Sequence, residues 1–179
     1  HYLPSSIGRI KTLNDFTNLA SLNWEEALKV FASPFFCNIF HENAEFYTLL
    51  YHGLTEIRCS SHEMEEFLIA SGKKKRARFS LETHELNFQV GEHPSDDLLK
   101  IRKSEWGNID IHISCDASFV KLEKKQLQMY DFRGKHTEVL VQIIPRLMHR
   151  GRNYAVITLE NCFQKEEIVI TAVSREESP

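Results

Sequence analysis

Cysteine and histidine are the residues of this chain best suited to metal or redox chemistry. The chain has nine histidines and four cysteines, and the closest pairing of the two types is Cys59 with His62. This spacing occurs in metal sites, but a structural zinc site needs four converging ligands, and no CxxC or second Cys–His pair completes this one. The sequence therefore predicts no metal centre.

The spacing of the cysteines also bears on the compartment. They stand at positions 37, 59, 115 and 162, too sparse for a disulfide framework in a chain of 179 residues. Cys115 and Cys162 are the one pair that could meet across a sandwich. Sparse cysteines favour a reducing compartment, so we expect a cytoplasmic protein.

No arrangement of residues predicts catalysis. There is no G-x-S-x-G motif, no cysteine in an electropositive turn, and no glycine-rich phosphate loop among the seven scattered glycines. Asp96 and Asp97 offer two carboxylates to calcium, but the rest of a calcium-binding pattern is absent. We therefore expect a protein that is not an enzyme and has no cofactor.

A run of basic residues is the first candidate binding feature. Like charges repel and extend a chain, so the run reads as a linker between two domains. The alternative is a nucleic-acid surface or nuclear-import signal, although the run has no interleaved aromatic residues. Its members are Lys73, Lys74, Lys75, Arg76 and Arg78.

Aromatic residues are the second candidate feature, because aromatic rings stack on sugars. Trp106 adjoins Gly107 in a predicted turn, where it could be exposed. Tyr130 and Phe132 are two residues apart and would share one face of a strand, which favours core packing. A carbohydrate-binding module using Trp106 and Tyr130 is therefore an alternative function.

The N-terminal part of the chain has the pattern of short amphipathic helices. Thr12 with Asp15, Asn23 with Glu26, and Ser60 with Glu63 have the spacing of helix N-caps. Ser33-Pro34 predicts a further helix start, followed by a strongly apolar cluster at residues 35–40.

Two further helices are predicted from the same periodicity. One spans residues 42–52, with Phe46, Leu49 and Leu50 facing inward and Gly53 ending the helix. The other follows Ser60 and ends at Gly72. The helical block is near the lower size limit for independent folding, so we expect it to pack against other parts of the protein.

From residue 76 onward, short alternating segments are separated by turn residues. The alternation is clearest in residues 109–115, where Ile109, Ile111, Ile113 and Cys115 face one way. Residues 139–144 are almost all apolar, as in a central strand covered on both faces. About seven strands at regular spacing predict an antiparallel β-sandwich.

Several short stretches resemble a known group of proteins. They are residues 86–88, the Trp106-Gly107 turn, residues 119–122, residues 131–134 and residues 149–157, preceded by the helical stretches 24–27 and 33–35. The chain resembles uncharacterised bacterial multidomain proteins in which a helical segment precedes an immunoglobulin-like domain. The antibody-type Cys…Trp…Cys arrangement is absent. The resemblance implies an immunoglobulin-like fold and carries over no activity and no functional residue.

Bulk composition fits a globular protein with an ordinary surface. The chain is 42% hydrophobic and 26% charged, with a net charge of −3, so no overall field attracts nucleic acid or an acidic membrane. There is no apolar run long enough to span a membrane and no signal sequence. Because it opens on His1, we expect a fragment of a longer protein.

Together these features predict an α+β chain with two parts. Residues 1–75 form a helical block with its basic linker, and residues 76–179 form an immunoglobulin-like antiparallel β-sandwich. The predicted function is a non-enzymatic protein-interaction or scaffolding segment of a larger bacterial protein, presenting a sandwich surface or an open sheet edge. The expected partner is protein, including neighbouring domains. Carbohydrate binding, and nucleic-acid binding through the basic run, are the alternatives.

Overall fold

The computed structural model describes residues 8–91 and 95–174 and divides the chain into two compact units. The first unit extends to Ala77 and also contains the short segment Glu105–Asn108. The second unit contains Arg78–Ser104 and the chain from Ile109 onward. The division falls two residues after the domain boundary expected from the sequence, with the 105–108 segment added to the helical unit.

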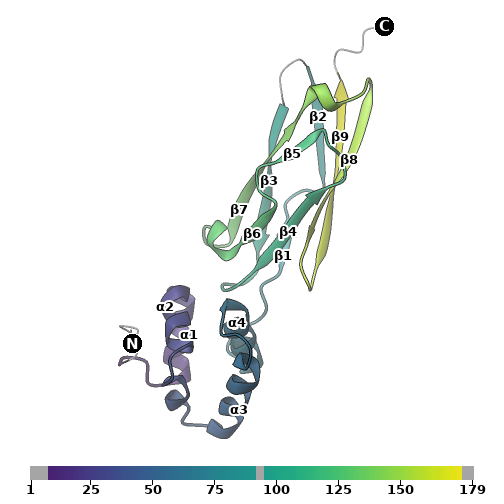
Figure 1. The fold of residues 1–179 in the computed structure, drawn as a ribbon. Helices are drawn as coiled ribbons and strands as arrows, with labels where there is room; N and C mark the ends of the chain where they lie inside the picture. Colours follow the sequence, from purple (N-terminus) through teal and green to yellow (C-terminus); the bar gives the residue numbers. More distant parts are fainter. Residues whose placement is uncertain (1–7, 92–94, 175–179) are drawn as a thin grey trace. The chain divides into compact units, whose positions relative to one another are not determined.

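The first unit is helical (Figure 1). Its elements are α1 (Leu13–Leu22), α2 (Trp24–Phe31), the 3₁₀ helix η1 (Phe36–Ile39), α3 (Ala44–Thr55) and α4 (Ser61–Ala70). The capping residues predicted for three of them are confirmed. Thr12 and Ser60 each form a reciprocal capping box, and the Asn23 side chain accepts from the Glu26 backbone N–H at 3.2 Å.

The core of the helical unit is aromatic. Phe16, Phe31, Phe36 and Phe67 are completely buried. Phe36 lies edge-on to Phe16, Phe31 and Phe67, with ring centroids 4.8, 5.1 and 5.5 Å apart. Edge-to-face packing adds to the free energy gained from burial, so these rings account for much of the stability of a small unit.

Two expectations for the helical unit are wrong. The stretch after Ser33-Pro34 forms only the four-residue η1, and Phe35, the residue before η1, is exposed. In α3, Phe46 and Leu49 face outward, and the helix continues past Gly53 to Thr55. The aromatic core takes Tyr47 and Tyr51 instead, because these residues lie on the helix face opposite the aliphatic ones.

The second unit is a β-sandwich of two sheets with nine strands among the described residues (Figure 1). One sheet has the order β1-β3-β7-β5, from β1 (Phe79–Leu81), β3 (Ser95–Lys103), β7 (His136–Ile143) and β5 (Val120–Leu122). The other has the order β2-β9-β8-β4-β6, from β2 (Glu85–Val90), β9 (Lys165–Ser174), β8 (Arg152–Glu160), β4 (Asp110–Cys115) and β6 (Gln126–Gln128). The β2–β9 pair is parallel and all other pairs are antiparallel.

The strands alternate as their sequence predicts, and their inward residues form the core. Leu99, Ile101, Ile111, Val141 and Ile157 are among the side chains with at most 1% of their surface exposed. Alternation places each of these residues between the two sheets and its neighbours in solvent.

The sandwich differs from the sequence-based expectation in detail. It has nine strands instead of about seven, and one of its strand pairs is parallel. Strand β7 is central in its sheet but alternates between buried and half-buried residues, so it is not covered on both faces. Tyr130 lies in the 3₁₀ helix η2 (Met129–Asp131) and is exposed while Phe132 is buried, so the two do not share a strand face.

Candidate functional site

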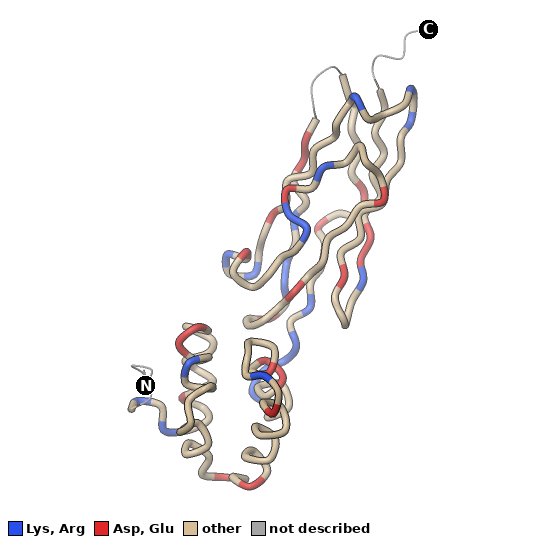
Figure 2. Tube along the Cα trace, in the orientation of Figure 1, with Lys and Arg blue, Asp and Glu red and all other residues tan. Residues whose placement is uncertain are grey.

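The basic run does not form a continuous exposed patch. The Lys74 ammonium is completely buried and forms an ion pair with Glu65 of α4. The Arg76 guanidinium binds both carboxylate oxygens of Glu66 at 2.7 and 3.1 Å. The run lies on the stretch between α4 and β1, which Figure 2 shows in blue.

The remaining members of the run have separate surroundings. Lys73 donates to the side-chain oxygen of Asn14 at 3.0 Å, whereas Lys75 and Arg78 are exposed. Arg78 belongs to the sandwich unit, where its backbone bonds to Ser104 in both directions. The spacing of the lysines and arginines alone could not show which of them would meet a carboxylate on α4.

Trp106 belongs to the cluster around the buried ion pair. Its ring lies edge-on to Trp24 with centroids 6.2 Å apart, and the Lys74 nitrogen lies 5.3 Å from the Trp106 ring centroid. The Asn108 N–H donates to Glu65 at 3.1 Å. Trp106 therefore offers a sugar less ring surface than an exposed turn residue would, since its side chain is half-buried.

The Lys74–Glu65 and Arg76–Glu66 ion pairs differ in how far they are exposed to solvent. Burial raises the pKa of Glu65, although Lys74 and the Asn108 N–H oppose that effect. The hydrogen bond from Arg76 lowers the pKa of the more exposed Glu66. The first pair thus holds two charges away from water and the second stands at the surface, an arrangement typical of structural ion pairs.

Tyr130 is the other predicted sugar-binding residue. It is 60% exposed and lies in η2 of the sandwich unit, whereas Trp106 belongs to the helical unit. The two residues therefore do not belong to one compact unit.

Metal-ligating and nucleophilic residues do not converge in the described part of the chain. Within residues 8–91 and 95–174, no group of three His, Cys, Asp or Glu side chains has the geometry of a metal site. All four cysteines are free thiols, including Cys115 and Cys162. None of the described helices is long and apolar enough to cross a membrane.

Helix α3 carries a surface that the sequence reading missed. Phe46 is 57% exposed, Leu49 is 67% exposed, and Ile57 just beyond the helix is 90% exposed. None of the residues of this twelve-residue helix is fully buried. Glu45 is its only acidic or basic residue apart from His52, and Figure 2 shows the helix largely in tan. The small number of charged residues in this helix was the signal in the sequence that part of its exposed surface is apolar.

The edge of β1 is partly covered. The Ser104 N–H donates to the Arg78 carbonyl, and the Glu82 N–H donates to the Lys100 carbonyl. In an antiparallel pair only every second residue bonds to the partner strand, so the backbone N–H and C=O of Phe79 point away from β3. There the Gln164 side chain accepts from the Phe79 N–H and donates to the Phe79 carbonyl, each at 2.9 Å. This amide takes the place of a neighbouring strand and blocks strand addition at that residue.

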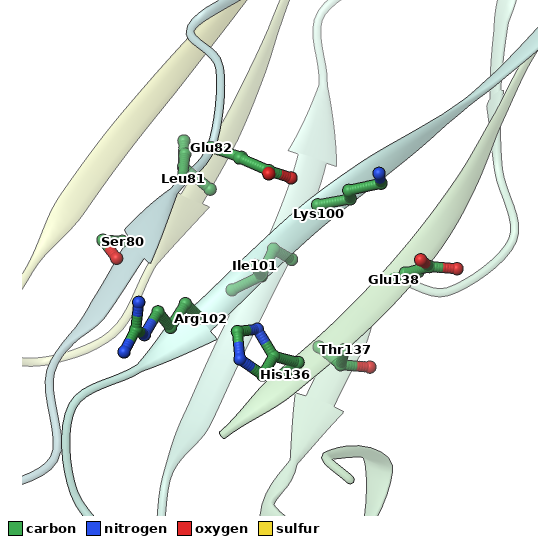
Figure 3. A pocket seen from close by; sticks show the side chains of 9 residues that line it. All are labelled: Ser80, Leu81, Glu82, Lys100, Ile101, Arg102, His136, Thr137 and Glu138. Atoms are coloured by element: carbon green, nitrogen blue, oxygen red, sulfur yellow. The ribbon is translucent and has the colours of Figure 1, made fainter. Parts of the chain in front are cut away.

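An open depression of about 450 Å³ lies on the sheet formed by β1, β3 and β7 (Figure 3). Its polar rim consists of residues that alternate with the buried core residues of the same strands. They are Ser80, Glu82, Lys100, Arg102, His136 and Glu138. The depression therefore lies on the outer face of the sheet and not between the two sheets.

Several solved structures are similar to part of this chain. A human PapD-like domain of CEP192 has a TM-score of 0.44 and 10% identity, covering 56% of this chain and 87% of that one. The E. coli chaperone DraB has a TM-score of 0.44 and 5% identity, covering 57% of each chain. The Calx CBD1 domain has a TM-score of 0.42 and 10% identity, covering 57% of this chain and 100% of that one.

The sequence itself gives a clearer assignment. No curated protein matches it. The N-terminal region of a family of unknown function, DUF5717, matches residues 1–179, the whole of the sequence. The expected resemblance to an uncharacterised family is thus confirmed, whereas its bacterial, multidomain character stays a prediction. The chain belongs to the DUF5717 N-terminal family.

Proposed function

We propose that this chain is a non-enzymatic protein-interaction segment of a larger bacterial scaffold, and that α3 provides its binding surface. The carrying observation is the apolar stripe of α3, which we define as Phe46, Leu49, Leu50, Gly53 and Ile57. Phe46, Leu49, Leu50 and Gly53 have the spacing i, i+3, i+4 and i+7, which places them on one side of α3, and Ile57 lies two residues beyond the end of the helix. Exposed apolar stripes of this kind mark binding sites.

The free energy available from covering the stripe is substantial. Burying one exposed Phe, Leu or Ile side chain gives about 1.5–3 kcal/mol. Phe46, Leu49 and Ile57 are each more than half exposed, so all three can still contribute. A surface ion pair gives only about 0–1 kcal/mol, so the apolar stripe outweighs any charged pair on this surface as a source of affinity.

The charges beside the stripe indicate the chemistry of the partner. Glu45 in the first turn of α3 and Glu56, its C-cap residue, are eleven residues or about three turns apart, which places them on the same border of the stripe, one near each end of the helix. A second copy of α3 would bring these acids together, whereas an amphipathic helix with Lys or Arg beside its apolar residues would pair with them. The proposed occupant is therefore a basic amphipathic helix of another protein or domain.

Two other functions receive less support. Nucleic-acid binding through the basic run would need Lys74 and Arg76, which already have carboxylate partners. Strand addition at β1 would have to displace the Gln164 amide from Phe79.

Site-specific photocrosslinking in cells tests the proposal. A benzophenone amino acid replaces Leu49 in the full-length protein, and the same group at Val169 of β9, which is 46% exposed, is the matched control. The crosslinked peptide is sequenced by mass spectrometry. We expect one partner peptide with a helical apolar periodicity and adjacent Lys or Arg residues, obtained from Leu49 and not from Val169.

Charge reversal supplies the second arm of the test. Glu45→Lys with Glu56→Lys should remove the crosslink while the far-ultraviolet circular dichroism remains unchanged, since both residues are exposed. A crosslink to a second copy of this chain, the same peptides from both positions, or no crosslink at Leu49 would each overturn the proposal.

A further inference from the structure

We infer that the outer face of the β1-β3-β7-β5 sheet carries a binding site for a small oxyanion, a carboxylate or a phosphate, formed by Ser80, Arg102 and His136. This site is separate from the proposed α3 surface, and its test does not depend on that proposal. It rests on the strand register, on the distribution of charge around the depression, and on the donor chemistry of the three side chains.

The register aligns the three side chains in one row. Ser80 pairs with Arg102 between β1 and β3, and Arg102 pairs with His136 between β3 and β7. All three residues are exposed, and residues directly paired across neighbouring strands project from the same face of the sheet. Directly opposite residues on antiparallel strands have Cβ atoms about 4.5–5.5 Å apart. Arg102 is therefore within reach of a ligand that also contacts either neighbour, as Figure 3 illustrates.

The adjacent row has a different charge. Lys100 pairs with Glu138 of β7, and on its other side Glu82, the residue after β1, donates its N–H to the Lys100 carbonyl. Lys100 thus has an acidic residue on each side and brings no excess positive charge (Figure 3). The two acidic and two basic residues of the depression balance overall, but the row that contains Arg102 has one positive charge and no acidic member.

The Arg102 guanidinium has no carboxylate partner within the described residues. The ion pairs of the described chain, defined by an N–O separation of up to 4.0 Å, involve other residues. A guanidinium presents two parallel N–H donors that fit a carboxylate or phosphate. The His136 imidazole donates an N–H in either protonation state, and the Ser80 hydroxyl rotates to donate a third hydrogen bond.

The size of the depression limits the ligand to a small molecule or a single group of a larger one. Its volume of about 450 Å³ lies near the lower end of the range usual for small-molecule sites, roughly 300–1,000 Å³. Buried Leu81 and Ile101 contribute to its floor. A carboxylate and a phosphate can each accept hydrogen bonds from the Arg102 guanidinium and from a neighbouring donor, so the two sources are separated by experiment.

The test is a titration of the ¹⁵N-labelled full chain, followed by NMR, with inorganic phosphate in one arm and acetate in the other at constant ionic strength. We expect saturable shifts of the Ser80, Arg102 and His136 backbone signals in at least one arm. The arm that saturates at lower concentration identifies the phosphate or the carboxylate as the preferred group.

Variants separate a formed site from general attraction between charges. Arg102→Gln should weaken binding at least tenfold. Arg102→Lys keeps the positive charge but loses the two parallel N–H donors, so it should weaken binding as well. The control Lys121→Gln removes an exposed cation of β5, outside the depression, and should leave the titration unchanged. Shifts that do not saturate, or that are equal in the parent chain and Arg102→Gln, would overturn the inference.

Discussion

Replacing Gly107 by alanine should destabilise the helical unit far more than the loss of a glycine ordinarily does. Gly107 has φ +104°, and a Cβ atom there would lie 2.7 Å from Glu65 Oε1 and 2.9 Å from Lys74 Cε. Both contacts are shorter than van der Waals separation. The added methyl group must therefore displace the buried ion pair or move the backbone of the 105–108 segment.

The magnitude follows from two contributions. An unfavourable backbone conformation costs about 1–3 kcal/mol, and overpacking of a well-packed site costs about 1–3 kcal/mol. We expect a loss of about 3 kcal/mol in the free energy of unfolding. For a domain of this size each kcal/mol shifts Tm by about 4–8 °C, so the midpoint should fall by roughly 12–24 °C.

The chain supplies its own probe and control for this measurement. Its only two tryptophans, Trp24 and Trp106, both lie in the helical unit, so tryptophan emission during urea or thermal unfolding reports on that unit. Gly72→Ala is the matched control, because Gly72 has φ +75° and open space around an added Cβ. The control should lose only about 1 kcal/mol. Equal losses in the two variants would refute the steric reasoning.

Three further predictions concern the Glu65–Lys74 pair, the Glu66–Arg76 pair and the Gln164 side chain. Glu65→Ala should cost about 3–5 kcal/mol in urea unfolding, because it leaves a buried ammonium without its partner. The interaction between Glu66 and Arg76 should be fully present above pH of about 4.3, the ordinary carboxylate value, and be lost as pH falls through the lowered folded pKa of Glu66. The unfolding free energies of the parent and Glu66→Gln should therefore differ by a constant amount above about pH 4.3 and converge as the pH falls below that value, and a difference that stays constant below about pH 4.3 would contradict the assignment. Gln164→Ala should lower the unfolding free energy of the sandwich by about 1–3 kcal/mol, measured by circular dichroism. It should also promote concentration-dependent association through the uncovered Phe79 backbone. An unchanged unfolding midpoint together with a monomer in sedimentation would contradict this prediction.

Local patterns in the sequence determined much of the secondary structure. The capping boxes at Thr12 and Ser60 and the alternation of residues 109–115 were recognisable because a hydrogen bond to a nearby N–H, or a two-residue period, involves only neighbouring residues. The helical segment and the sandwich followed from these patterns.

Tertiary structure decided which of several apolar faces is buried and which charges are paired. Both faces of α3 are apolar, and the aromatic side containing Tyr47 and Tyr51 packs against the Phe36 cluster, which leaves Phe46 and Leu49 exposed. Periodicity cannot choose between two apolar faces, because that choice depends on the shape of distant residues.

The basic run and the sheet depression show the same limit for charged residues. The sequence of residues 73–78 does not indicate that Lys74 is buried against Glu65 while Arg78 is exposed. Nor did the strands reveal that Ser80, Arg102 and His136, up to 56 positions apart, would share one row. Strand register is fixed by long-range pairing, so the sequence by itself determined the donors and only the tertiary structure brought them together.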